Sequence, residues 1–319
     1  MVNKKTALSF IVILQLIILL LVVAGCVPKQ KKLAPKRLIS EPTISLYLNE
    51  TGEVKRLKIE EYVEGVVAAE MDTNWPINAL AAQAILARTF TLKQIKDKGG
   101  VPQHKTDAST SVEEFQAYNP KKANKAVRLA VEMTRGEVVK YKGSYINAWF
   151  SACDGGTEAS AAEGLSYQQE KTPYIRAGVK DGCLGITVKE NKIWNTSFPL
   201  NIVRNAVLKV TGKDTGEINS GNVSVAQTGP SGRATLLRIG KTDVNGAALR
   251  LALGSDKMRS IFVEKIYVQD GSLIMKGKGY GHGVGMCQWG ARGLASKGKS
   301  PKDIINFYFR DVRIEKLWK

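Results

Sequence analysis

Histidine and cysteine are scarce in this chain, with 2 His and 4 Cys among 319 residues. The low His content excludes a metal site built from several imidazoles, and there is neither an HExxH motif nor a CxxC pair. The few Cys also exclude a small scaffold held together by disulfides. A GxxxxGK[ST] loop is missing as well, so we do not expect a P-loop nucleotide site.

Acidic residues are in the minority: the chain has 29 Asp and Glu and 47 Lys and Arg, which gives a net charge of +18. This excess suits an anionic partner, and nucleic acid, anionic lipid and an acidic cell-wall polymer are all open. Hydrophobic residues make up 44% of the chain, which is enough for a packed core. The length suggests one large or two fused globular units.

Residues 1–26 have the pattern of a targeting segment. A basic start is followed by an almost wholly apolar run from Ala7 to Ala24, and small residues directly precede Cys26. Small residues before a Cys resemble the lipidation site of bacterial lipoproteins. An uncleaved signal anchor is the alternative, since the apolar run is just long enough to span a bilayer. Both place the body on the extracytoplasmic face of a membrane and argue against nucleic acid as partner.

The rest of the chain divides into a basic tether, 27–43, and one folded domain, 44–319. Hydrophobic periodicity predicts strands at 44–48, 54–59, 137–141 and 146–150, and helices at 59–71, 77–96, 124–134 and 300–309. A loop region is expected at 151–185, and strands with a short helix at 222–276. The expected fold class is α+β: mixed sheets with an Ala-rich helix pair, in a single large domain behind an N-terminal membrane anchor.

Glu70 is predicted to lie on the apolar side of its helix. At about 100° per residue it falls near the middle of a stripe formed by Ile59, Tyr62, Val63, Val66 and Val67. The opposite, solvated face is predicted to carry Glu60, Glu61 and Glu64. An apolar setting raises the pKa of a carboxyl group, which suits a general acid. A structural role, in which Glu70 pairs with Arg88 or a Lys, is the alternative.

Glycine occupies every second position from Gly277 to Gly285. In an extended chain these glycines would share one face, opposite Tyr280 and His282. Such a face lets a sugar or another backbone approach closely, and tight packing against the core is the alternative reading. Gln288 and Trp289 follow and offer an amide and an aromatic face, both suited to saccharide contact.

Several motifs follow one another along residues 45–310. They are YVEGVVAAEM (62–71), ALAAQAILARTF (79–90), QAY (116–118), TRGEVV (134–139), AWFSACDGGT (148–157), SGR (231–233), LR (249–250) and GHGVGMCQWGA (281–291). Together they resemble the stage II sporulation protein D family, whose GHGVGMSQWGA motif differs from the last segment at one position. The catalytic glutamate of that family lies in its EM motif, which corresponds to Glu70.

The resemblance implies a peptidoglycan lytic transglycosylase that needs no cofactor. Such an enzyme cleaves the β-1,4 bond after N-acetylmuramic acid in glycan strands stripped of stem peptides, and it leaves a 1,6-anhydro end. A non-catalytic module that binds peptidoglycan and stimulates a separate wall amidase is the main alternative, and a structural tether is a third. The implied partners are glycan strands, a wall amidase and other engulfment proteins, at the cell membrane of a Gram-positive-type bacterium.

The residues predicted to bind substrate lie within these motifs. They are Arg88, Ser151, Gly155, Gly156, Tyr280, His282, Gly283, Gln288 and Trp289. A side chain at Gly283 is expected to block sugar at little cost in stability, unless this glycine has a positive φ. Asp72 and Asp154 are read as polar loop residues, with a helper role in catalysis as the alternative.

The state of the cysteines is left open by the sequence. The resemblance extends to relatives thought to hold zinc through His and Cys near the Gly-Gly loop, but here Ser151 stands where many of them have His. Zinc bound through Cys153 and Cys183, a disulfide between them, and free thiols all remain open. Cys287 replaces the usual Ser of the motif and is expected to be a small buried packing residue.

Overall fold

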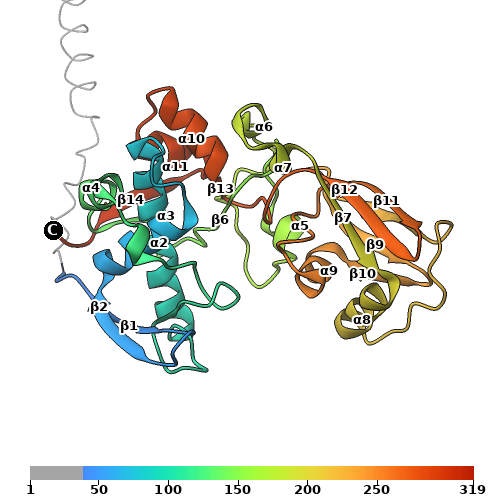
Figure 1. The fold of residues 1–319 in the computed structure, drawn as a ribbon. Coiled ribbons are helices and arrows are strands. Elements are labelled where there is room, and N and C mark those ends of the chain that lie inside the picture. Colours follow the sequence, from blue (N-terminus) through green and yellow to red (C-terminus); the bar gives the residue numbers. More distant parts are fainter. Residues whose placement is uncertain (1–38) are drawn as a thin grey trace, which may run out of the picture. The chain divides into compact units, whose positions relative to one another are not determined.

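The computed structural model describes residues 39–319, which form a mixed α+β fold with several small sheets (Figure 1). The α+β fold class is therefore confirmed. The predicted targeting segment 1–26 and most of the tether 27–43 lie outside the described residues, so the anchor and the domain boundaries stay predictions. Between residues 39 and 319, no helix is both long and apolar enough to cross a membrane.

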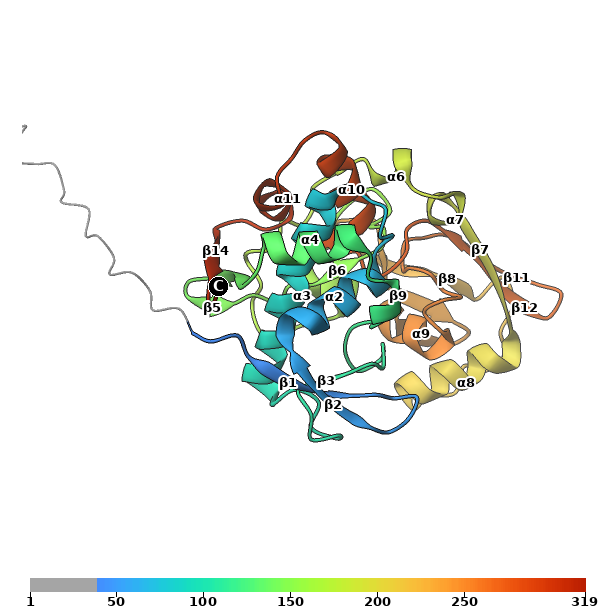
Figure 2. The same ribbon diagram turned by 60° about the vertical axis from the view of Figure 1, so that its left-hand side comes forward.

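One hydrophobic core is built around the predicted helix pair, α2 (Ile59–Glu70) and α3 (Ile77–Lys98). Helix α3 contacts α2, α4 (Lys125–Met133), α10 (Gln288–Ser296) and α11 (Pro301–Tyr308), as Figures 1 and 2 show. Two three-stranded sheets belong to this part, in the orders β2-β1-β3 and β14-β4-β5. Their strands are β1 (Thr43–Tyr47), β2 (Val54–Lys58), β3 (Ala108–Ser109), β4 (Glu137–Tyr141), β5 (Ser144–Tyr145) and β14 (Val312–Lys316).

A second hydrophobic core lies between two further three-stranded sheets, ordered β10-β9-β8 and β11-β12-β7. The strands are β7 (Trp194–Pro199), β8 (Val223–Thr228), β9 (Ala234–Ile239), β10 (Thr242–Asn245), β11 (Val263–Gln269) and β12 (Ser272–Gly277). Helices α8 (Leu200–Thr211) and α9 (Gly246–Leu253) pack on these sheets. The remaining elements are η1 (Pro120–Lys122), α5 (Ala161–Leu165), α6 (Cys183–Ile186), α7 (Lys189–Lys192), and the parallel pair β6 (Phe150–Ser151) and β13 (Met286–Cys287).

The ends of α3 follow from local sequence. Pro76 precedes the first helical residue, where its missing N–H costs nothing, and the Ala-rich interior has high helix propensity. Gly99 ends the helix in the left-handed conformation, with φ +69, and its N–H bonds to the carbonyl of Ile95. Helix α2 likewise ends where expected, at Glu70, with the N–H of Met71 bonded to Val67.

Two local predictions are wrong. A strand over 146–150 is not formed, since only Phe150 and Ser151 pair, in parallel with β13. The glycine row is not extended either: φ is +84 at Gly279, +106 at Gly281, +67 at Gly283 and +82 at Gly285. Positive φ at alternate residues makes the chain turn repeatedly, so these glycines do not share one face.

Glu60 is buried, although helical periodicity placed it on the solvated face of α2. The residue is 4% exposed, and its side chain forms an ion pair with Arg88, with 2.6 Å between Arg88 Nη2 and Glu60 Oε2. Three further donors reach the same carboxylate. They are Arg88 Nε at 3.0 Å, the backbone N–H of Gly136 at 2.9 Å and Trp318 Nε1 at 2.8 Å. The carboxylate thus joins α2, α3, the start of β4 and the end of the chain.

Replacing Arg88 is expected to destabilise the fold strongly. In Arg88→Met, the carboxylate of Glu60 stays buried without its cation, which typically costs about 3–5 kcal/mol of unfolding free energy. The matched control is Lys55→Met, which breaks the exposed Lys55–Glu61 pair and is expected to cost less than about 1 kcal/mol. Urea unfolding measures both, and equal losses would show that the buried pair has no special importance.

Candidate active site

A pocket of about 420 Å³ opens beside the C-terminal end of α2. Its wall combines residues from distant parts of the chain, among them Glu70, Phe90, Phe115, Gln116, Trp149, Phe150 and His282. The carboxyl end of α2 and the glycine-rich segment before β13 therefore meet at one site. Glu70 also lines a second hollow of about 480 Å³ with Asp72 and Thr73, so the carboxyl group borders open space on two sides.

The carboxyl group of Glu70 is half-buried and held by two donors. Its Oε1 accepts a hydrogen bond from the backbone N–H of Ala117 at 3.0 Å, and the side chain of Gln288 is the second donor. Burial raises the pKa of Glu70 above its ordinary value, and the two hydrogen bonds lower that pKa by less than burial raises it. The group is thereby disposed to carry a proton and to give it up inside the pocket.

Gly65 lets the backbone of Ala117 reach Glu70. A Cβ atom at Gly65 would come within 2.2 Å of the ring of Tyr118, which stacks on Tyr62 with 5.5 Å between ring centroids. The N–H of Asn119 also bonds to the carbonyl of Gly65 at 2.9 Å. The segment after Gln116 therefore lies directly against α2, because this turn of the helix has no side chain.

His282 is held as a neutral imidazole. Burial, together with the positive charges of Arg250 and Arg233, lowers its pKa from 6.5 to about 3. The backbone N–H of Val284 donates to Nδ1 at 3.0 Å, so the proton of the neutral ring lies on Nε2. The backbone of Phe150 takes the hydrogen bond of the other ring nitrogen, so His282 is an uncharged ring fixed at the pocket by two backbone contacts.

The start of α10 carries the other two predicted contact residues. Gln288 is buried, and its Nε2 lies 3.4 Å from Gln83 Oε1. Trp289 is partly exposed and meets Trp75 edge to face, with 4.7 Å between ring centroids, while the guanidinium of Arg292 lies 4.8 Å from its ring. The sequence analysis did not single out Trp75. The one signal in the sequence was the presence of an aromatic residue five positions after Glu70.

Neither Gln288 and Trp289 nor the remaining predicted contacts line the pocket of Glu70 and His282. The guanidinium of Arg88 is fully buried and occupied by Glu60, as described above. Ser151 is buried, and its Oγ has no hydrogen-bond partner. The ring of Tyr280 lies under Arg259, whose guanidinium carbon is 3.9 Å from the ring centroid.

The glycines of the two predicted loops have structural constraints of their own. Gly155 and Gly156 have positive φ and lie close to Phe262 and Leu184, respectively. At Gly283, where φ is +67, a Cβ would come within 1.8 Å of Arg233. The exception stated for Gly283 therefore applies: a side chain there clashes with a buried guanidinium and destabilises the fold.

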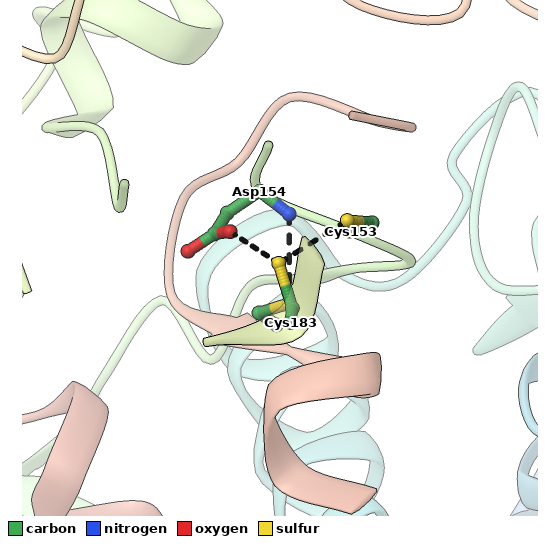
Figure 3. Close-up of side chains that lie close together, drawn as sticks. Cys153, Asp154 and Cys183 are labelled. Carbon is green, nitrogen blue, oxygen red and sulfur yellow. Dashed lines mark hydrogen bonds between the residues drawn. The ribbon is translucent and has the colours of Figure 1, made fainter. Parts of the chain in front are cut away.

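A group of sulfur and oxygen ligands lies apart from this pocket. We call it the cysteine cluster, and it consists of Cys153, Asp154, Cys183 and Cys287. The three thiols are buried and free, with 3.2 Å between the sulfurs of Cys153 and Cys183 (Figure 3). Cys287 is buried as predicted, but its sulfur lies beside two other thiols and a carboxylate rather than only filling space.

Asp72, which was read as a polar loop residue, is exposed. Its carboxylate accepts a hydrogen bond from the backbone N–H of Asn74.

Comparison with known proteins places the chain among sporulation proteins. Residues 47–141 match the family model described as stage II sporulation protein, SpoIID. Stage II sporulation protein D of Bacillus amyloliquefaciens is 30% identical, covering 91% of this chain and 84% of its own length. An uncharacterised protein of Brachyspira hyodysenteriae is 34% identical, over 82% of this chain and 67% of that protein. The amidase enhancer of Bacillus subtilis is 31% identical over 77% of this chain, which spans only 39% of it.

The imidazole of His282 is expected to stay neutral under mildly acidic conditions. The NMR signals of its ring protons should not shift between about pH 8 and pH 5. These signals are identified as the ones that disappear in His282→Gln. Because the unfolded chain takes up this proton near pH 6.5 and the folded chain only near 3, stability should fall as the pH drops through that window. The loss is at most about 1.4 kcal/mol per pH unit and disappears in the variant. A titration midpoint near 6.5 in the folded protein would contradict this account.

Proposed function

We propose that this chain, which belongs to the stage II sporulation protein D family, is a lytic transglycosylase that cuts the glycan strands of peptidoglycan. The observation that carries the proposal is the environment of Glu70. Burial raises the pKa of this carboxyl group, which faces a pocket shared with the neutral imidazole of His282. A single acid in such a setting suits a reaction in which one group both gives and takes back a proton.

The proposed reaction needs no water. Protonated Glu70 donates its proton to the oxygen of the β-1,4 bond between N-acetylmuramic acid and N-acetylglucosamine, and the bond from that oxygen to C1 breaks. The Glu70 carboxylate then removes the proton from the C6 hydroxyl of the same muramic acid. Its O6 attacks C1 and closes the 1,6-anhydro ring, which returns Glu70 to its starting state. Two-carboxylate hydrolases instead use the second group to activate water or to form a covalent intermediate.

Two further carboxylates need to be considered. Glu113 and Glu114 also line the pocket, but both are solvent-exposed, and Glu114 hydrogen-bonds with His104 at 3.0 Å. The pKa of Glu114 is lowered, first by a hydrogen bond with Ser109, which is the opposite of what a general acid requires. We therefore assign the proton transfers to Glu70 alone.

The surrounding side chains suit a saccharide. We assign to the neutral ring of His282 a contact with the sugar, and to Gln288 the positioning of Glu70. The partly exposed rings of Trp75 and Trp289 offer an aromatic surface for a sugar ring. The net charge of +18 favours approach to the anionic polymers of a cell wall.

A second candidate function follows from the similarity to the amidase enhancer of Bacillus subtilis. On this alternative, the chain binds peptidoglycan and stimulates a separate wall amidase without cutting glycan itself. Glu70 would then be a structural or binding residue. The two functions differ in whether replacing Glu70 removes an activity of the purified chain.

Glu70→Gln is expected to reduce glycan cleavage at least about 100-fold, because the amide keeps the size of the side chain but cannot act as an acid. The full chain, purified in mild detergent, is incubated with glycan strands stripped of stem peptides, and 1,6-anhydro ends are measured by mass spectrometry. Thermal unfolding is expected to be little changed. The matched control is Glu64→Gln, on the same helix but outside the pocket, which should cut normally.

Three outcomes would contradict the proposal. Cleavage by Glu70→Gln at the rate of the unchanged protein would make Glu70 structural. Reducing ends without an anhydro ring would indicate a hydrolase that uses a second carboxylate. Absence of any cleavage by the unchanged protein, with stimulation of an added wall amidase, would favour the enhancer function.

We also propose that residues 1–26 hold the domain on the extracytoplasmic face of the membrane, with Cys26 as the lipidated residue. Cys26→Ala should then abolish incorporation of a labelled fatty acid and leave the longer, unprocessed chain. Fatty-acid labelling is read after gel electrophoresis, with Cys287→Ala as the matched control. Labelling that is absent from the unchanged protein would instead favour an uncleaved anchor.

A further inference from the structure

The cysteine cluster brings together three sulfurs and a carboxylate from three separate segments of the chain. All four ligand atoms lie within 4.8 Å of one another, and all four residues are buried. Cys153 and Asp154 follow β6, Cys183 begins α6, and Cys287 ends β13 directly before α10. Figure 3 shows Cys183 between Cys153 and Asp154, with its sulfur donating to Asp154 Oδ1 at 3.0 Å.

The cluster contains more acceptors than donors. Asp154 Oδ2 is buried and has no hydrogen-bond partner, and neither do the two carboxylate oxygens of the fully buried Glu158. The nearest cation is Arg233, whose Nη2 donates to the backbone carbonyl of Asp154 at 2.5 Å and not to its carboxylate. A buried carboxylate oxygen without a partner costs free energy, and a cation at the cluster would satisfy it.

The sulfur of Cys287 is the target of two backbone N–H groups. Its sulfur accepts hydrogen bonds from the backbone N–H groups of Gly290, at 3.3 Å, and Asp154, at 3.5 Å. Cys287 is also the N-cap residue of α10, where the helix dipole stabilises negative charge. Backbone N–H groups directed at sulfur are the kind of outer contact that orients metal-binding thiolates.

We propose that the cysteine cluster binds one zinc ion through three thiolates and the carboxylate of Asp154. Four ligands drawn from sulfur and oxygen match the tetrahedral coordination of structural zinc. With Zn–S bonds of about 2.3 Å, the sulfurs of such a site lie roughly 3.8 Å apart, within the spread of this cluster. Binding replaces the three thiol protons with three Zn–S bonds and releases the protons to solvent.

The proposed ion has a structural role. Its four ligands leave no coordination position open for water or substrate, and none of them lines the pocket of Glu70. It ties the loop after β6 to α6 and to the start of α10. The same stretch of chain continues to Gln288, whose side chain hydrogen-bonds with Glu70, so zinc would help to hold that donor in place.

A disulfide and three free thiols are the competing states. A disulfide between Cys153 and Cys183 requires the sulfurs to move from 3.2 Å to about 2.05 Å and leaves Cys287 as a single thiol. Neither competing state uses the carboxylate of Asp154 as a ligand, whereas zinc uses all four groups of the cluster. The spread of 4.8 Å also suits one ion better than a cluster of several irons.

The first experiment measures metal content and thiols in the full chain, purified in mild detergent without chelator or added metal. Mass spectrometry of the elements is expected to find about one zinc per chain. After zinc is removed under reducing conditions, cobalt should bind in its place and give the visible absorption of a tetrahedral cobalt–thiolate site. Protein with neither zinc nor cobalt, and with all three thiols reactive after unfolding, overturns the proposal. A chain mass that is too low by two hydrogens, and that reductant restores, indicates the disulfide. This result also overturns the zinc proposal.

Variants identify the ligands. Cys183→Ser and Cys287→Ser are expected to lose most of the zinc, and Asp154→Asn to bind it at least about 10-fold more weakly in competition with a coloured chelator. The matched control is Val131→Ala, which weakens the core away from the cluster and should retain its zinc. Full zinc in both Cys variants overturns the proposal. If a Cys variant fails to fold, the metal content and cobalt spectrum of the unchanged protein decide.

Discussion

A buried carboxylate at the start of α2 organises the half of the molecule that contains the pocket. Glu60 accepts hydrogen bonds from Arg88 on α3, from the backbone before β4, and from Trp318 near the end of the chain. A buried charge tolerates no missing partner, so these three segments have to meet around it. The rotation of α2 is thereby set at its first turn, and Glu70 at the last turn faces the pocket as a consequence.

Local patterns predicted the elements of this half well, because helix α2, helix α3 and strand β4 are each specified by their own periodicity and end signals. The burial of Glu60 could not be predicted in this way. A helical wheel describes one helix alone, whereas Glu60 is buried by partners up to 258 positions away in sequence. The prediction of an extended glycine segment was wrong for a related reason. Alternating glycines fit both an extended strand and a series of turns, and only tertiary contacts decide between the two conformations.

The candidate site was predictable in part. The wheel placed Glu70 among apolar neighbours, and the family resemblance joined it to His282, with which it shares a pocket. Part of what tunes Glu70 was not visible, since one of its two donors is the backbone N–H of Ala117 and sequence does not reveal backbone position. The cysteine cluster was only partly foreseen. Cys153 and Cys183 stood out as a pair, and Asp154 directly follows Cys153, but Cys287 joins them only through the parallel pairing of β6 with β13.

The missing side chain at Gly65 on α2 has a consequence for the acidity of Glu70. The hydrogen bond from Ala117 pulls the pKa of Glu70 down against burial, and it exists because Tyr118 can settle against Gly65. How tightly that segment is docked therefore sets how readily Glu70 gives up its proton. The acidity of this site can be tuned from a neighbouring loop, with the carboxyl group and the pocket wall left untouched.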